Sequence, residues 1–205
     1  AIYTLNYDLL LYWVILKENL HKEFKDCFKY SIDKDKQGDN HYVNWYLQNK
    51  YFTTLYYLHG GLHLYGATHE IIKYCFSNGR TLKEQIIQSM NENRLPLFVS
   101  GETYSKKIHI INSSDYLSNA LNSLKKCKDT LFIHGFNFNE NDWHIMEAIA
   151  YSKIEKIFIS LYRENNIDGI CKAIDKIKFF REKLRDKEAA LEAIYYDAES
   201  AKVWR

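Results

Sequence analysis

The sequence predicts an α/β fold with a mostly parallel sheet and helices on both faces. In the second half of the chain, short buried strands alternate with helices, which is typical of parallel sheets. At the start, a short β-rich run ends in Asn6 and Asp8 and passes directly into an apolar helix. Ligands of open α/β sheets bind outside the carboxyl ends of the strands, so this switch is the first candidate for a site.

Composition favours one globular unit. The chain has 205 residues, 46% of them hydrophobic, which suits a single domain over 1–205. Its formal net charge is only +2 and its lysines are scattered, so we expect no nucleic-acid partner. The longest apolar run, 9–16, is far shorter than the roughly 20 residues that span a bilayer. The four cysteines form no C-x-x-C pair, which favours a reduced, cytoplasmic setting.

The first elements are predicted from apolar runs and polar breaks. Residues 2–5 form a strand, and 7–18 form a helix that is apolar nearly all round and therefore buried, with Asn6 as its N-cap. Residues 20–50 are rich in Lys, Asp, Asn and His and form a polar surface insertion. Because Ala1 already stands at the edge of a buried strand, we expect further chain upstream of it.

The middle of the chain contains a second strand, over 51–59, that ends in His59-Gly60-Gly61. Residues 63–76 continue as a hairpin or an irregular segment. The spacing of apolar residues and caps then predicts a helix over 81–91, a short strand over 96–100, a polar loop over 101–107 and an amphipathic helix over 114–126.

The last third gives the clearest alternation. A buried strand over 130–135 breaks at glycine, and a helix follows through Trp143 and Ala150. We expect another strand over 156–161, another helix over 168–185 and a final extended segment over 191–204. Three predicted strands therefore deliver polar or glycine residues to one edge of the sheet: Asn6 and Asp8, His59 and Gly60, and Gly135 with Asn137 and Asp142.

These residues carry a resemblance. Thr4-Leu5-Asn6-Tyr7-Asp8 resembles the T-x-N-x-D motif of sirtuins, and Leu58-His59-Gly60 resembles their His-Gly motif. Gly135-Phe136-Asn137, with Asp142 further on, is similar to the later glycine motif, G-x-S followed by an Asp. Longer blocks around the first two motifs resemble a bacterial sirtuin-related family of unassigned function.

The resemblance implies a Rossmann-like, sirtuin-like NAD fold and cleavage of the bond between nicotinamide and ribose. Some relatives use this reaction to deplete NAD in defence against phage. By the resemblance, Asn6 positions water or the carboxamide, Asp8 holds the nicotinamide end, and His59 accepts a proton. The positions expected to contact NAD are Thr4, Gly60, Gly135, Asn137 and Asp142.

The sequence also departs from the sirtuin pattern and leaves alternatives open. It contains no G-x-G-x-x-G loop and no zinc cysteines, and Asn137 stands where the motif has Ser. His59 and His63 are separated by two glycines, so we expect no metal. The alternatives are a module that senses NAD or ADP-ribose, or helps assemble a larger complex, without cleaving NAD, and a scaffold that keeps the motif residues for packing. A homo-oligomer is left open.

Overall fold

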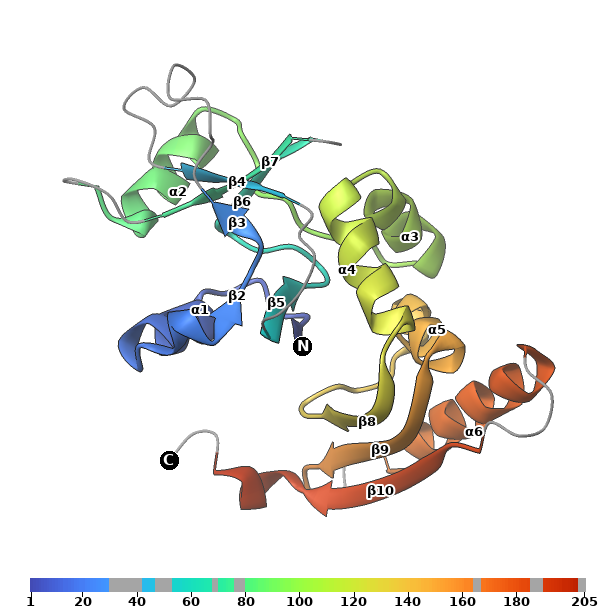
Figure 1. Ribbon diagram of the computed structural model, residues 1–205. Helices are drawn as coiled ribbons and strands as arrows, with labels where there is room; N and C mark the ends of the chain where they lie inside the picture. Colours follow the sequence, from blue (N-terminus) through green and yellow to red (C-terminus); the bar gives the residue numbers. More distant parts are fainter. Residues whose placement is uncertain are drawn as a thin grey trace. The chain divides into compact units, whose positions relative to one another are not determined.

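A computed structural model describes residues 1–29, 42–46, 53–67, 70–75, 80–163, 167–184 and 190–202 (Figure 1). The chain divides into two compact units, which we describe separately. Unit 1 comprises Ala1–Gly101 and Ile108–Ala120, and unit 2 comprises Glu102–Lys107 and Leu121–Arg205. Each unit combines helices with a parallel sheet, which confirms the α/β class. One domain over 1–205 with an insertion over 20–50 stays a prediction.

Unit 1 is built on a parallel sheet of order β1-β5-β2. Its strands are β1 (Ile2–Thr4), β5 (Thr53–Tyr57) and β2 (Phe24–Lys25). β1 and β5 run side by side, with Thr4 opposite Tyr57, so the carboxyl ends of these two strands meet at one edge. The strands predicted over 2–5 and 51–59 are therefore confirmed within the described residues.

The first helix differs from its prediction. α1 (Leu10–Lys17) begins three residues later than expected and its N-cap is Leu9, so the prediction of Asn6 as N-cap is wrong. The reason is that the carbonyl of Tyr7 accepts a hydrogen bond from the amide of Leu62 at 2.9 Å, which holds 6–8 out of the helix. The expected burial is also wrong, because only Ile15 of this helix is buried and Trp13 is 52% exposed.

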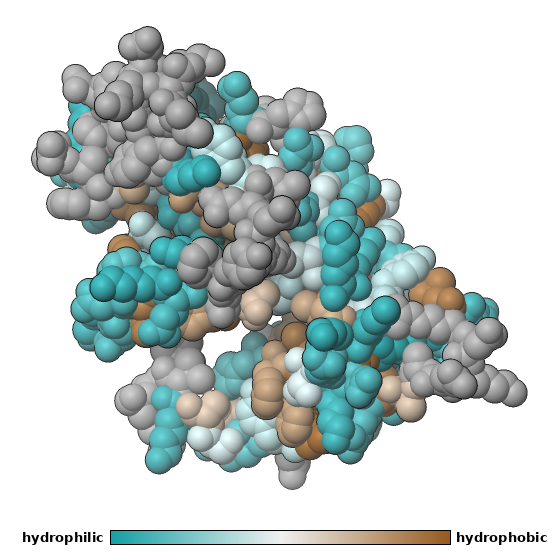
Figure 2. All heavy atoms as spheres, in the orientation of Figure 1, coloured by the Kyte–Doolittle hydropathy of each residue, from teal (hydrophilic) through white to brown (hydrophobic). Residues whose placement is uncertain are grey.

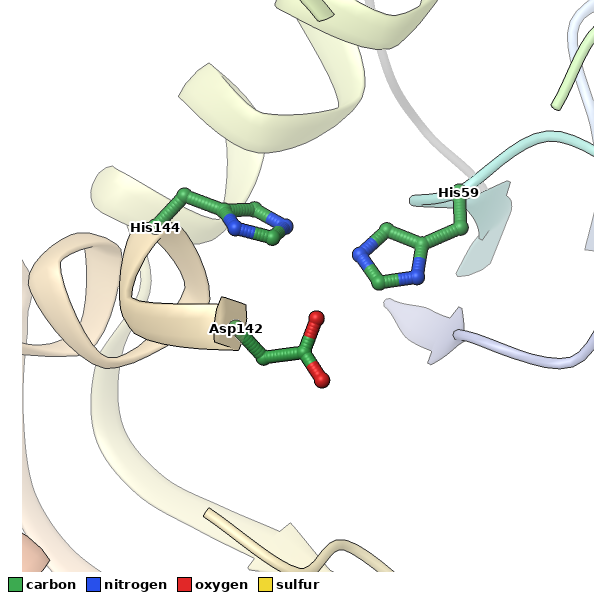
Figure 3. A group of neighbouring side chains, drawn as sticks. All are labelled: His59, Asp142 and His144. Atoms are coloured by element: carbon green, nitrogen blue, oxygen red, sulfur yellow. The ribbon is translucent and has the colours of Figure 1, made fainter. Parts of the chain in front are cut away.

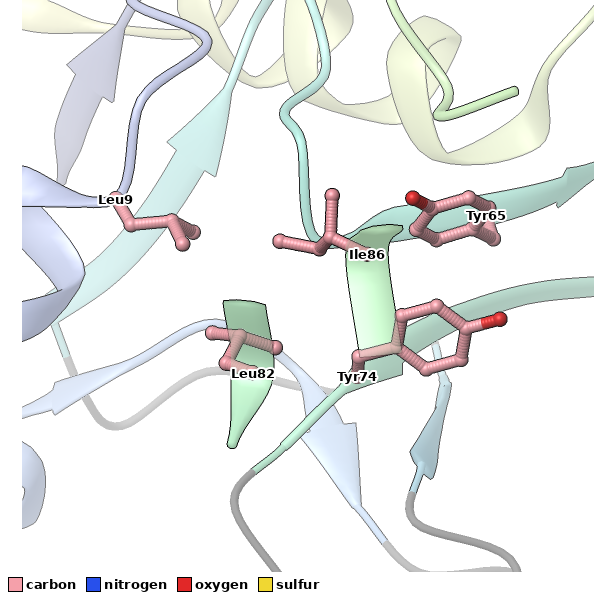
Figure 4. Packing of buried hydrophobic residues seen from close by; sticks show 5 residues of the cluster. All are labelled: Leu9, Tyr65, Tyr74, Leu82 and Ile86. Atoms are coloured by element: carbon pink, nitrogen blue, oxygen red, sulfur yellow. The ribbon is translucent and has the colours of Figure 1, made fainter. Parts of the chain in front are cut away.

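A second, antiparallel sheet of order β3-β4-β7-β6 completes the strands of unit 1. Its hairpin of β6 (Leu64–Ala67) and β7 (Glu70–Tyr74) confirms the first of the two alternatives for 63–76. α2 (Leu82–Asn91) packs on this sheet through the cluster in Figure 4, which contains Leu9, Tyr65, Tyr74, Leu82 and Ile86. The remaining strands and the short 3₁₀ turn of this part are β3 (Phe28–Lys29), β4 (Tyr42–Trp45) and η1 (Leu20–Lys22).

The predictions for 81–126 are confirmed in part. α2 (Leu82–Asn91) starts from a capping box in which Thr81 and Glu84 bond each other's backbone, and α4 (Asp115–Lys125) matches the predicted amphipathic helix. The strand over 96–100 is reduced to a single antiparallel bridge between Gly60 and Phe98. The polar loop predicted over 101–107 is wrong from Tyr104, where α3 (Tyr104–Asn112) begins. The apolar pattern of this segment is weak, but its first turn makes contacts in unit 2, described below, that stabilise a helix.

The interior of unit 1 holds a polar and aromatic cluster around His63. The His63 ring is fully buried, lies edge-on to Tyr57 at 4.7 Å between centroids and stacks on Tyr12 at 5.6 Å. Lys73 forms a buried ion pair with Asp26, and its ammonium lies 4.9 Å from the Tyr12 ring. Burial opposes the charge on Lys73, but the attraction of Asp26 together with contributions from Tyr12 and Cys75 raises the pKa of the amine.

His63 itself is held neutral. Burial, followed by the nearby Lys73 charge, lowers the pKa of His63 to about 3. Neither ring nitrogen has a hydrogen-bond partner among the described residues, and the same holds for the hydroxyl of Tyr57. An imidazolium ion here would lie beside an ammonium ion without solvent, so protonation is compatible with the unfolded chain and not with the folded one.

Unit 2 is a three-stranded parallel sheet of order β10-β9-β8. β8 (Lys128–Ile133), α5 (Trp143–Tyr151), β9 (Lys153–Leu161), α6 (Ile167–Leu184) and β10 (Glu192–Asp197) follow in sequence, with η3 (Glu140–Asp142) before α5 and η4 (Ala198–Ala201) at the end. This alternation confirms the strands predicted over 130–135 and 156–161 and the helices after them.

The strands of unit 2 step in one direction across the sheet, so right-handed crossovers place α5 and α6 on the same face. Ile157 and Ile159 on that face are fully buried. The opposite face carries Phe132, which is 68% exposed and stacks on Phe158 at 4.7 Å. Figure 2 accordingly shows hydrophobic side chains where Figure 1 draws β8 and β9. The predicted burial of β8 is therefore wrong, and helices on both faces of the sheet stay a prediction.

Two expectations about the chain's setting can be compared with the structure. None of the helices in the described ranges has the length and apolarity required to cross a bilayer. All four cysteines lie within the described ranges, and none of them forms a disulfide bond.

The neutral state of His63 predicts a loss of stability in acid. The folded pKa is about 3 and the unfolded value is about 6.5, so unfolding takes up a proton between these limits. Stability is then fully present above pH ~6.5 and falls as the pH drops toward ~3, by about 1.4 kcal/mol per pH unit. Urea unfolding from pH 7 to pH 4 should show this extra slope in the native chain and not in His63→Phe. His109→Phe, at an exposed histidine, is the control, and equal slopes in the native chain and His63→Phe would contradict the assignment.

Candidate functional site

The candidate site of unit 1 forms where β1 and β5 end side by side. The amide of Leu58 donates to the carbonyl of Thr4 at 2.9 Å, which extends the pairing of the two strands by one residue. Asn6 and Asp8 follow the first strand, and His59 and Gly60 follow the second. The structure thus brings together five predicted site residues from the two segments: Thr4, Asn6, Asp8, His59 and Gly60.

Tyr7 holds this edge together through three contacts. Its carbonyl accepts from the amide of Leu62, and its hydroxyl donates to the carbonyl of Val99 at 2.7 Å. Its ring stacks on the His59 imidazole, with 6.3 Å between centroids and 26° between planes. The β1–α1 turn, the β5 turn and residues 97–99 are therefore joined through one side chain and its main chain.

His59 is held at the site by its main chain as well as by its ring. Its carbonyl accepts from the amide of Val99 at 2.8 Å, and the side chain is only 4% exposed. A buried imidazole with a fixed backbone has few rotamers open to it, so its ring nitrogens keep one orientation. That is the property required of a general base, whose geometry matters before its pKa does.

The polar residues after β1 have local partners of their own. The hydroxyl of Thr4 accepts from the amide of Asn6 at 3.1 Å. One carboxylate oxygen of Asp8 accepts from the amide of Leu10 at 2.9 Å and so supports the start of α1. Asn6 is exposed, so its amide group faces solvent at the edge. Asp8 thus uses one carboxylate oxygen for a structural contact and has a second carboxylate oxygen besides.

Gly60 is required by the backbone at this edge. Its φ is +80°, in the left-handed region, and a Cβ atom at this position would lie 2.0 Å from the carbonyl oxygen of Leu97. The neighbouring amide of Gly61 donates to that same oxygen at 2.9 Å. The glycine therefore allows the β5 turn to approach 97–98 closely.

The other three predicted residues lie in unit 2, at the carboxyl end of β8. Gly135 has a φ of +70°, and a side chain there would meet no atom within 4 Å. Its amide donates to the hydroxyl of Ser160 at 2.9 Å. Asn137 is exposed in the loop that follows. α5 begins only at Trp143, so Gly135 does not stand at the helix N-terminus, as a phosphate-binding turn would require.

Asp142 precedes α5 and is engaged within unit 2. Lys107 donates to its carboxylate at 2.6 Å, and both side chains are largely buried. Figure 3 shows Asp142 and His144 at the start of α5, with the fully buried His144 on its first turn. The Tyr104 hydroxyl donates to Glu147 at 3.0 Å on the same helix. These contacts dock the first turn of α3, and they give Asp142 a structural partner that a bound nucleotide would have to share.

Sequence reasoning did not single out Tyr7 or Lys107. Tyr7 lies between Asn6 and Asp8, which are predicted site residues, but a tyrosine at this position does not itself indicate any chemistry. Its place inside the T-L-N-Y-D block could have indicated it. Lys107 belongs to the segment predicted as a polar loop, but it is buried. Only the fold of α3 brings it to Asp142.

Comparison with known proteins gives a family and no further relatives. A family model described as a domain of unknown function, DUF4917, matches residues 1–204. No curated protein and no solved structure matches the chain.

Gly60 and Gly135 both have a left-handed φ, but their surroundings predict different costs for the same substitution. Gly60→Ala forces a side chain into the Leu97 carbonyl in addition to backbone strain, and should lower the free energy of unfolding by at least about 3 kcal/mol. Gly135→Ala meets open space and should cost only the left-handed strain, about 1–2 kcal/mol. Urea unfolding of both variants measures the difference. Equal losses would show that the close approach at Gly60 is not rigid.

Proposed function

The chain belongs to the DUF4917 family, and we propose that it binds NAD and hydrolyses the bond between nicotinamide and ribose. The observation that supports this most is the meeting of Asn6, Asp8 and His59 at the paired ends of β1 and β5. His59 lies more than fifty positions from Asn6 and Asp8 in sequence, yet adjacent parallel strands bring the three residues to one edge. Ligands of α/β proteins bind at such edges.

The residue types suit this hydrolysis. Breaking the C1′–N bond leaves both bonding electrons on nicotinamide and builds positive charge on the ribose, and the Asp8 carboxylate would stabilise this charge. Water forms the new C1′–O bond, and Asn6 would orient it. His59 would take the proton that water loses and pass it to solvent. The products are nicotinamide and ADP-ribose, and no metal takes part in these steps.

In unit 1, Thr4 and Gly60 would contact the ADP-ribose part of the substrate. Both lie beside the proposed reaction centre, where the glycine lets the β5 turn pack closely against 97–98. Gly135, Asn137 and Asp142 follow β8 in unit 2, and their contact with NAD stays a prediction. A sirtuin-like fold, a cytoplasmic location and a role in bacterial defence against phage belong to the same proposal.

A second candidate is binding of NAD or ADP-ribose without cleavage. It is favoured by the contact of Asp8 with the amide of Leu10, because this hydrogen bond already uses one carboxylate oxygen at the start of α1. A carboxylate held in this way still binds a ribose or amide group, but it stabilises a developing charge less effectively.

If the protein hydrolyses NAD, the full chain should release nicotinamide from NAD, and chromatography measures this release. Asn6→Ala and His59→Gln should each lower the rate by at least about 100-fold, because each removes a group that acts in the reaction. His59→Gln retains a polar side chain of similar reach, so its melting temperature should change little. Asn91→Ala and His109→Gln, at exposed positions on α2 and α3, are the matched controls.

The outcomes separate the proposals. Binding of NAD by the native chain without release of nicotinamide would favour the sensing module. If the native chain neither binds NAD nor releases nicotinamide, and both site variants have lowered melting temperatures, the scaffold alternative is favoured.

A further inference from the structure

The carboxyl edge of the unit 2 sheet carries a second group of side chains that the proposed reaction does not use. The strand register places Ser160 opposite Tyr196, and His134 directly follows the last residue of β8. Because side chains alternate between faces along a strand, these three lie on the face that also carries Phe132 and Phe158. The Nδ1 atom of His134 lies 3.1 Å from the hydroxyl of Tyr196, and the two rings stack.

Arg163 extends this group at the end of β9. Tyr162 follows the strand with the same parity as Ser160, so its exposed ring lies on the same face. The guanidinium of Arg163 lies 5.0 Å from the centroid of the Tyr162 ring. Arg163 adopts a left-handed φ of +54°, which turns the chain back at this point. Within the described ranges Arg163 forms no ion pair with a carboxylate.

Gly135 joins the two strand ends. Its amide reaches the hydroxyl of Ser160, three residues before Arg163, and the space where its side chain would stand is open. The β8 turn therefore leaves its backbone accessible beside a cation and exposed aromatic rings. The nearest acid on β10, Asp197, already accepts a hydrogen bond from the amide of Glu199 at 2.9 Å.

In a β-α-β nucleotide site, the end of the second strand lies beside the adenosine ribose. An acid at that place binds the free 2′-hydroxyl of NAD, whereas an arginine accommodates the 2′-phosphate of NADP. β8, α5 and β9 form a β-α-β unit, although its first turn lacks the glycine at the helix N-terminus, and the described residue at the end of its second strand is Arg163. A guanidinium group suits a phosphate because it offers several donors in one plane.

We propose that Arg163 selects a 2′-phosphorylated adenosine, so that the nucleotide bound at the unit 2 edge is of the NADP class. This inference rests on the proposed nucleotide binding and concerns the edge of unit 2 alone. His134 and Tyr162 supply aromatic surface for the base, Gly135 supplies open backbone, and Arg163 supplies the charge that distinguishes NADP from NAD.

The experiment compares two ligands that differ only in one phosphate, 2′,5′-ADP and AMP, by calorimetric titration of the full chain. The native chain should bind 2′,5′-ADP at least about tenfold more tightly than AMP. Arg163→Ala should remove this preference and leave AMP binding within about twofold. Lys153→Ala removes an exposed charge at the opposite end of β9 and is the matched control, which should keep the preference.

Several results would overturn the inference. These are equal binding of the two ligands, no binding of either, or a preference that survives Arg163→Ala. Tighter binding of AMP would mean that an acid binds the 2′-hydroxyl, and Glu164, which follows in the sequence outside the described residues, would be its first candidate.

Release of nicotinamide from NAD and NADP is measured in parallel. Release of nicotinamide without a preference for 2′,5′-ADP in the titration would contradict the role of Arg163 and leave the proposed hydrolysis intact. Release from neither dinucleotide, with 2′,5′-ADP still bound through Arg163, would contradict hydrolysis alone.

Discussion

The edge of unit 1 depends on the anchoring of Tyr7. Its carbonyl bonds the amide of Leu62, its hydroxyl bonds the carbonyl of Val99, and its ring stacks on His59. Three chain segments that are distant in sequence are thereby held in one arrangement, and the same contact with Leu62 delays the start of α1. Parallel pairing of β1 and β5 brings the two strand ends together, but Tyr7 determines how the polar residues after them are presented.

Much of the fold follows from local pattern. The alternation in the last third predicts β8, α5, β9 and α6, because buried strands and amphipathic helices differ in period. The start of α1 could not be predicted, because it is set by a bond to Leu62, more than fifty residues away. The same holds for α3, whose polar first turn is stabilised by Asp142 and Glu147, both on or beside a later helix. Tertiary contacts override local preference in both cases.

The types of residue in the candidate site could be predicted from the sequence, but their geometry could not. Asn6, Asp8 and His59 were chosen from their positions after strands, and the strand pairing supports that choice. Asp142 was chosen by the same reasoning, but its ion pair with Lys107 depends on the fold of α3. Arg163 follows β9 without any motif of its own, and only the strand pairing brings the end of β9 beside Tyr196 on β10.

The tyrosines of unit 1 act through their hydroxyl groups as well as their rings. The hydroxyl of Tyr116, fully buried on the first turn of α4, accepts a hydrogen bond at 3.0 Å from the main-chain amide of Tyr57. That amide proton lies inside the molecule and cannot reach deuterated solvent unless α4 moves away from β5. Its isotope exchange rate is therefore a direct gauge of how often the helix and the strand separate.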